Sequence, residues 1–175
     1  MQTNKRRTWL TSDLHLFHEN IMVYCNRDFN NVYAMNEHIV KTWNDTVSND
    51  DRVIIVGDLS ASLRRRQADL AAICTSLKGN KILIRGNHDY EPDNWYIENC
   101  GFDGVYTHLY EDGILFVHQP ATERCMTSVD LVEQCNPKII VHGHIHTNTP
   151  NISEHFNVAW DRFNRMISLN EVPVE

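Results

Sequence analysis

The sequence predicts a layered α/β sandwich in one domain that spans residues 1–175. Short runs of β-forming apolar residues alternate with stretches of helical periodicity, and further strands follow toward the C-terminal end. Three runs, RVIIV (52–56), KILIR (81–85) and KIIVHG (138–143), are almost continuously apolar, which is typical of strands buried on both faces. A chain of 175 residues is also long enough to bury a substantial core.

The first half of the chain predicts strands and helices in alternation. TWLTS (8–12) predicts the first strand, and apolar residues then recur at helical spacing from Val32 to Val47. RVIIV is the second strand. A second helical stripe follows from Leu63 to Leu77, with Gly79 as the expected C-cap, and KILIR is the third strand.

After Gly101 the pattern becomes richer in strands. GVYTHLYEDGILFVH contains two β-rich runs around EDG, which predicts a hairpin. TSVDLVEQC (127–135) predicts a short helix, and KIIVHG predicts another buried strand. The final segment, HFNVAWDRFNRMISL, predicts two strands joined by a tight connection.

Composition narrows the classes of function. The chain carries 16 Lys and Arg against 23 Asp and Glu, a net charge of −7, which argues against nonspecific binding to nucleic acid or anionic membranes. Five cysteines without a C-x-x-C pair favour free thiols in a reducing cytosol over a disulfide framework or a zinc ribbon. No signal peptide is visible, and no apolar run approaches the ~20 residues that span a bilayer. We therefore expect a cytoplasmic protein without membrane contact.

Polar residues follow five of the predicted strands directly, where open α/β sheets place their ligand sites. GD and GNH alone are common turn sequences. D-x-H alone is better explained as a turn Asp beside a surface His. The alternating histidines of GHIH have few structural uses, whereas His142 points to the opposite face and is expected to be packed or exposed. Their combination in one order predicts a metal site. Its candidate ligands are Asp13, His15, Asp58, Asn87, His118, His144 and His146.

The types of ligand indicate the class of metal. Carboxylate, imidazole and amide oxygen ligands, without thiolate, suit Mn, Fe or Zn. They do not suit a cysteine-rich structural zinc site. Seven ligands are too many for one ion, but they suit two ions bridged by one carboxylate.

The motifs DLH (13–15), GD (57–58), GNHD (86–89), VHQP with His118, and GHIH (143–146) make the chain resemble the calcineurin-like metallophosphoesterases. It is similar in particular to small stand-alone bacterial and phage members, through SDLHLFHENIMVYCNRDF and FNVAWD. The resemblance covers residues 8 to about 170. It implies a four-layer αββα sandwich of two mixed β-sheets flanked by helices.

The resemblance also implies a role for each motif residue. Asp58 would bridge two divalent metals; Mn²⁺ is favoured, with Fe, Zn, Ni or Mg as alternatives. One metal would be held by Asp13, His15, Asp58 and His146, the other by Asp58, Asn87, His118 and His144. A hydroxide activated by both metals would attack phosphorus, while His88 contacts the phosphate and protonates the leaving group, with Asp89 as its orienting partner.

The sequence does not name the ester. We expect a phosphodiester or phosphomonoester, with a small diester or nucleotide favoured and nucleic acid disfavoured because no basic stripe accompanies the site. Asn20 and Arg27 are candidate substrate contacts, with a capping Asn and a solvated Arg as the equally weighted alternative. A catalytically silent metal-binding scaffold of the same fold is the rival function, and the His88–Asp89 pair counts against it.

Overall fold

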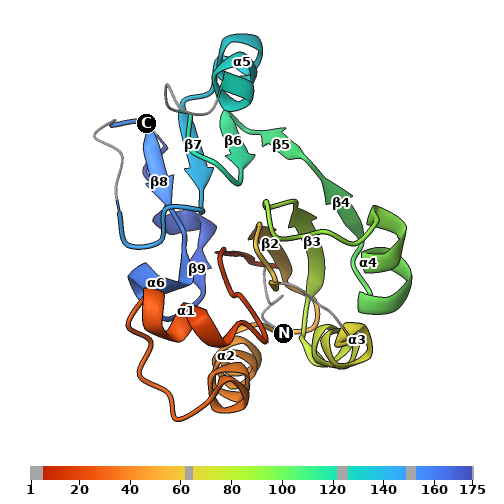
Figure 1. Ribbon diagram of the computed structural model, residues 1–175. Coiled ribbons are helices and arrows are strands. Elements are labelled where there is room, and N and C mark those ends of the chain that lie inside the picture. Colours follow the sequence, from red (N-terminus) through yellow and green to blue (C-terminus); the bar gives the residue numbers. More distant parts are fainter. Residues whose placement is uncertain (1–5, 62–64, 122–125, 149–152, 175) are drawn as a thin grey trace, which may run out of the picture.

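Two mixed β-sheets pack against each other at the centre of the molecule, with helices on both outer sides (Figure 1). The computed structural model describes residues 6–61, 65–121, 126–148 and 153–174. The first sheet has the strand order β4-β3-β2-β1-β9, in which β9 is antiparallel to β1 and the other pairs are parallel. The second sheet has the order β5-β6-β7-β8, in which β5 is antiparallel to β6. The predicted sandwich of two mixed sheets flanked by helices is confirmed.

The strands are short and the helices are unequal in length. The strands are β1 (Thr8–Thr11), β2 (Arg52–Val56), β3 (Asn80–Ile84), β4 (Gly104–Tyr106), β5 (His108–Glu111), β6 (Ile114–Val117), β7 (Ile139–His142), β8 (His155–Asn157) and β9 (Ile167–Ser168). The helices are α1 (Glu19–Tyr24), α2 (Val32–Thr46), α3 (Gln67–Ser76), α4 (Asp93–Cys100), α5 (Met126–Cys135) and α6 (Trp160–Phe163), with a 3₁₀ turn at Leu169–Glu171.

The central strands bury both of their faces, as their apolar runs predict. In β2, Val53 and Ile55 pack in the cluster formed with the helices, whereas Ile54 and Val56 pack between the two sheets. This division follows from the alternation of side chains along a strand. The continuous apolar run is thus explained by two separate cores on opposite sides of one sheet.

Helices close the sandwich on its outer sides. The outer core of the first sheet contains buried residues of α2, α3 and α4, among them Trp43, Leu70 and Tyr96. On the other side, Leu131 and Val132 of α5 pack on the outer face of the second sheet. No helix in the described ranges is long and apolar enough to cross a membrane.

The EDG hairpin forms as predicted, with Glu111 paired to Ile114 and positive φ at both Asp112 and Gly113. Two such φ values suit a two-residue loop whose twist matches that of the flanking strands. The strand before the hairpin, β4, belongs to the first sheet, so the chain changes sheets between β4 and β5.

Other predictions differ from the structure at element boundaries. Helix α3 begins at Gln67, later than the predicted Leu63, although residues 62–64 lie outside the described ranges. Its C-cap is Leu77, while Gly79 has a φ of +89° in the connection to β3. The last two strands, β8 and β9, lie in different sheets and are connected through α6. The predicted tight connection between them is therefore wrong. The sequence does not predict α1 and α4, because six and eight residues are too few for a clear helical period.

Candidate metal centre

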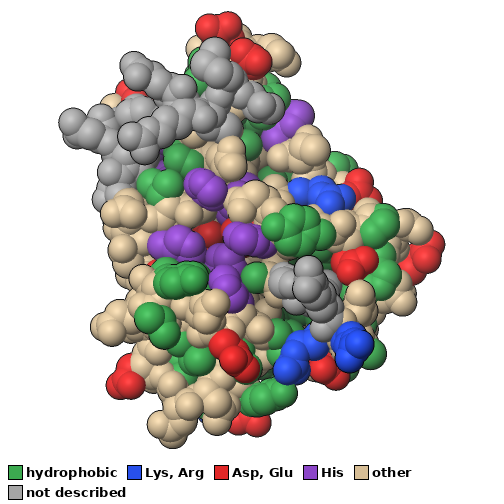
Figure 2. All heavy atoms as spheres, in the orientation of Figure 1, with side chains coloured by type: hydrophobic (Ala, Val, Ile, Leu, Met, Phe, Trp, Pro, Cys, Tyr) green, Lys and Arg blue, Asp and Glu red, His purple; other side chains and the backbone are tan. Residues whose placement is uncertain are grey.

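The loops after β1, β2, β3, β6 and β7 bring together all of the candidate ligands. One cluster contains Asp13, His15 and His146, and a second contains Asp58, His118 and His144; within each, one ligand atom per residue lies within 4.8 Å of the others. On one face of the molecule, histidine side chains gather around carboxylates (Figure 2). The parallel strands explain this convergence, since their carboxyl ends meet at one edge.

Asp58 belongs to the second cluster and also reaches the first. Its Oδ2 atom is 3.5 Å from Nε2 of His15 and 3.4 Å from Nε2 of His118. Asn87 joins the second cluster, because its Oδ1 atom lies 3.1 Å from the same His118 nitrogen. This placement suits the bridging position that the resemblance implies for Asp58.

The backbone holds the ligand loops in an uncommon conformation. The φ angles of Asp13, His15, Asp58, His144 and His146 are +56°, +50°, +53°, +69° and +50°. Non-glycine residues rarely adopt such values, and they persist at functional sites where the surrounding structure fixes them. Hydrogen bonds provide that support: the amides of Asp13 and His15 donate to the carbonyls of Gly57 and Asp58, both at 3.0 Å.

Two motif glycines leave space for ligands from other loops. A Cβ atom on Gly86 would clash with the Asp58 carboxylate, and one on Gly143 would clash with Ser12 and with the Asp13 carboxylate. The glycines of GNHD and GHIH are therefore required by close packing between neighbouring loops.

The protonation states of His15 and Asp58 suit metal ligands. Burial lowers the pKa of His15 to about 3, so its ring is neutral, and its buried Nε2 atom has no hydrogen-bond partner within the described residues. Burial raises the pKa of Asp58, but the hydrogen bond with His118 and the charge of that ring outweigh it and lower the pKa to about 2. An orphaned imidazole nitrogen that faces buried carboxylates fits a divalent cation.

His88 lies beside this centre. Its amide donates to Oδ1 of Asp58 at 2.9 Å, and its ring centroid is 5.4 Å from that of His15. The ring is half-buried, so a bound ester could reach it. His18 also lies at the mouth, with its ring centroid 6.2 Å from that of His88.

Asp89 lies differently from its expected place as the orienting partner of His88. Its carboxylate accepts backbone N–H groups from Asp58 at 2.9 Å, Leu59 at 3.0 Å and Gly86 at 2.8 Å. Burial is the main cause that raises the pKa of this carboxyl to about 6. Asp89 therefore ties the loop that carries Asp58 to the loop that carries His88.

Arg27 is buried, so its side chain does not face solvent as a substrate contact or a solvated Arg would. Its side chain is 4% exposed, and its Nε and Nη2 atoms donate to the Asp161 carboxylate at 2.7 and 2.9 Å. It donates further to the carbonyls of Asp13 at 2.7 Å and Leu14 at 2.8 Å. Arg27 thus braces the first ligand loop, whereas Asn20 is exposed on α1.

Asp161 is the important site residue that the ligand motifs do not include. It lies 2.6 Å from Nδ1 of His146, and its only sequence signal is the WD of FNVAWD. Cys25 also lies within reach of His146 and Asp161. Burial raises the pKa of the Cys25 thiol to about 12, so this thiol is protonated unless a bound cation displaces its proton.

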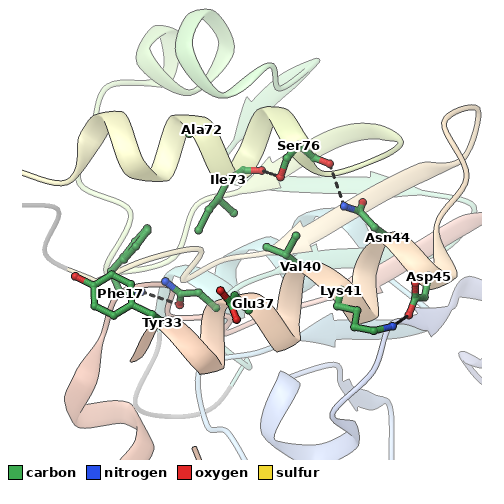
Figure 3. A pocket seen from close by; sticks show the side chains of 11 residues that line it. Phe17, Tyr33, Glu37, Val40, Lys41, Asn44, Asp45, Ala72, Ile73 and Ser76 are labelled. Carbon is green, nitrogen blue, oxygen red and sulfur yellow. Dashed lines mark hydrogen bonds and ion pairs between the residues drawn. The ribbon is translucent and has the colours of Figure 1, made fainter. Parts of the chain in front are cut away.

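A separate hollow lies away from these clusters. It has a volume of about 580 Å³ and lies between α2 and α3, where Val40 and Ile73 face each other and Asn44 donates to the carbonyl of Ser76 (Figure 3). Its lining contains none of the candidate metal ligands. The hollow therefore belongs to the helical layer and not to the metal centre.

Comparison with known proteins agrees with this geometry. The family model of the calcineurin-like phosphoesterases matches residues 6–120. The uncharacterized protein MJ1445 of Methanocaldococcus jannaschii is 32% identical over 144 residues, covering 82% of this chain and 71% of that protein. The Gene 66 protein of Mycobacterium phage L5 is 31% identical over 196 residues, covering 94% and 91%.

A solved structure shares the fold. The Aquifex aeolicus protein of unknown function AQ665 superposes with a TM-score of 0.75 at 23% identity, over 96% of this chain and 98% of that one. The family model covers well over half of the sequence and includes four of the five ligand-bearing loops. The chain belongs to the calcineurin-like phosphoesterase family.

Proposed function

We propose that this protein is a hydrolase of phosphoric esters, with a small diester or a nucleotide as the favoured substrate. The observation that carries the proposal is that Asp58 belongs to one ligand cluster and reaches the other, with His88 hydrogen-bonded to it through the backbone. Membership of the family supports the reaction class. The substrate and the roles below are our inference.

The donor set suits two divalent ions, Mn²⁺ foremost, held by the ligands assigned above with Asp58 shared. Ions bound there would supply positive charge for the phosphate oxygens and would lower the pKa of a coordinated water. The protein contributes imidazole and carboxylate ligands on loops that backbone hydrogen bonds hold in place.

His88 is the proposed general acid. Hydrolysis adds water across a P–O bond, and the departing oxygen must take up a proton as that bond breaks. A half-buried imidazole beside Asp58 is positioned to donate that proton, which contributes typically ~10²–10⁴-fold to the rate. Asp89 acts on this step indirectly, by fixing the loop that carries His88. Asn20 remains a proposed substrate contact, while Arg27 is proposed to act through the Asp13 loop and Asp161.

A catalytically silent scaffold is the second candidate, because members of this family include inactive proteins. Hydrolysis of bis-p-nitrophenyl phosphate and p-nitrophenyl phosphate, without metal and with added Mn²⁺, separates the two. We expect Mn²⁺-dependent cleavage by the wild type and its loss in His88→Ala. The control His108→Ala changes a histidine on the edge strand β5 and should behave as the wild type. Metal-loaded wild type that cleaves neither ester supports the scaffold.

A further inference from the structure

Two exposed tyrosines stand at the mouth of the metal centre. Tyr24, at the end of α1, is 72% exposed, and Tyr90, just after the GNHD loop, is 69% exposed. Single exposed aromatic residues are ordinary on protein surfaces. These two are distinguished by their contacts, because each ring meets a histidine of the centre edge to face.

The four rings form a continuous row. The Tyr24 centroid lies 6.3 Å from that of His18, the His18 centroid 6.2 Å from that of His88, and the His88 centroid 6.1 Å from that of Tyr90. The histidines occupy the middle of the row, and the tyrosines form its solvent-exposed ends. Hydrophobic side chains border the histidine group on this face (Figure 2).

A phosphate bound beside His88 would have its ester substituents over this row. A sugar or an aliphatic chain can pack on an aromatic face, but neither offers a planar ring that stacks on it. A planar base gains stacking and buries apolar area, and such stacking tolerates any base because every base has a π-face. The row therefore favours a substituent with an aromatic ring.

We infer that Tyr24 and Tyr90 are stacking platforms for a nucleobase, so that the substrates of this site are nucleotide esters. The inference rests on the proposed hydrolytic function and assigns it a substrate class and two specificity-determining residues. The net charge of −7 directs the choice toward small nucleotides and away from long nucleic acid.

The test compares two esters with the same leaving group, thymidine 5′-(p-nitrophenyl phosphate) and ethyl p-nitrophenyl phosphate. The measured quantity is the ratio of their kcat/KM values with Mn²⁺ present. In the double variant Tyr24→Leu/Tyr90→Leu, we expect this ratio to fall about 10- to 100-fold, the range that base stacking commonly provides. The control Tyr110→Leu removes a tyrosine that is 44% exposed on β5 and should keep the wild-type ratio.

The hydroxyl of Tyr90 needs its own control, because it lies 3.5 Å from Nδ1 of His88. The double variant Tyr24→Phe/Tyr90→Phe keeps both rings and should keep the ratio near the wild-type value. An unchanged ratio in the leucine variant would overturn the inference. An equal fall of the ratio in the phenylalanine variant would also overturn it, since the hydroxyls rather than the ring faces would then select the substrate.

If the wild type cleaves neither ester, the proposed hydrolytic function fails, but the inference about base stacking does not. A binding measurement then tests the inference separately. Calorimetry of the Mn²⁺-loaded protein would compare adenosine 5′-monophosphate with ribose 5-phosphate, which carries the same phosphate without a base. Tighter binding of the nucleotide by about 10-fold or more, lost in the leucine variant, supports the inference. Equal affinities of the two ligands would overturn it.

Discussion

The Nδ1 atom of His146 lies 2.6 Å from the Asp161 carboxylate, which Arg27 holds from another side. Burial raises the pKa of Asp161, but the hydrogen bonds from His146 and Arg27 outweigh it and lower the pKa to about 2. The carboxylate is therefore ionised and keeps the His146 proton on Nδ1. This arrangement directs Nε2 of His146 toward Asp13, 3.9 Å from its Oδ1 atom. Orienting the ring in this way is the usual role of a carboxylate behind a metal-binding histidine.

Asp161→Asn should weaken metal binding without removing a ligand. The loss of the charge behind His146 is expected to lower the affinity for Mn²⁺ by about 10- to 100-fold. Competition with a metal-binding dye measures this affinity, and circular dichroism checks that the variant folds. Asp45→Asn, an exposed acid on α2, is the matched control. Wild-type affinity in Asp161→Asn would show that His146 does not depend on this carboxylate.

Asp89→Ala should destabilise the protein. Three backbone N–H groups lose their acceptor in a buried place, and we expect the free energy of unfolding to fall by about 3 kcal/mol. Urea denaturation measures the change, with Asp28→Ala, an exposed acid, as the control. A loss as small as that of the control would mean that water replaces the carboxylate at no cost.

Stability should depend on pH through His142, which is 0% exposed on β7. Burial, aided by the neighbouring His155, lowers the pKa of His142 to about 4. Between pH 6.5 and 4 the unfolded chain binds a proton at this residue that the folded chain does not. The free energy of unfolding therefore falls as the pH falls through this window, by as much as about 3 kcal/mol from His142.

The measurement for His142 is urea denaturation of metal-free protein at several pH values. His142→Gln lacks the titrating group and should show a shallower fall in stability between pH 6.5 and 4. Identical slopes for the variant and the wild type would contradict a neutral, buried His142.

The sequence predicts the elements whose local pattern of apolar and polar residues directly reflects how they are buried in the fold. RVIIV and KILIR show as strands because the sheets bury both of their faces, and the polar residues after them identify one edge of a sheet. Boundaries are harder where no local signal exists. Helix α1 is six residues long, and β8 and β9 enter different sheets only because of long-range packing.

The ligands are also easier to predict than the residues that support them. A ligand follows a strand in a short motif, whereas Arg27 and Asp161 are 134 positions apart and meet only in the folded chain. The sequence shows an arginine near the first motif, and its charge suggests a phosphate contact. Only the structure shows that its guanidinium is buried against Asp161 and the carbonyl of Asp13. Asp89 similarly looks like a partner of its neighbour His88 until its three backbone contacts are seen.

The most direct test is a titration of metal-free protein with Mn²⁺ that follows bound metal and the hydrolysis of bis-p-nitrophenyl phosphate together. We predict two ions per chain, with activity that appears as the second ion binds. Asp58→Asn, which removes the charge shared by both clusters, should lose binding and activity together. The account would be contradicted by a wild-type protein that binds two ions and hydrolyses no phosphoester, or by an Asp58→Asn variant that retains full activity.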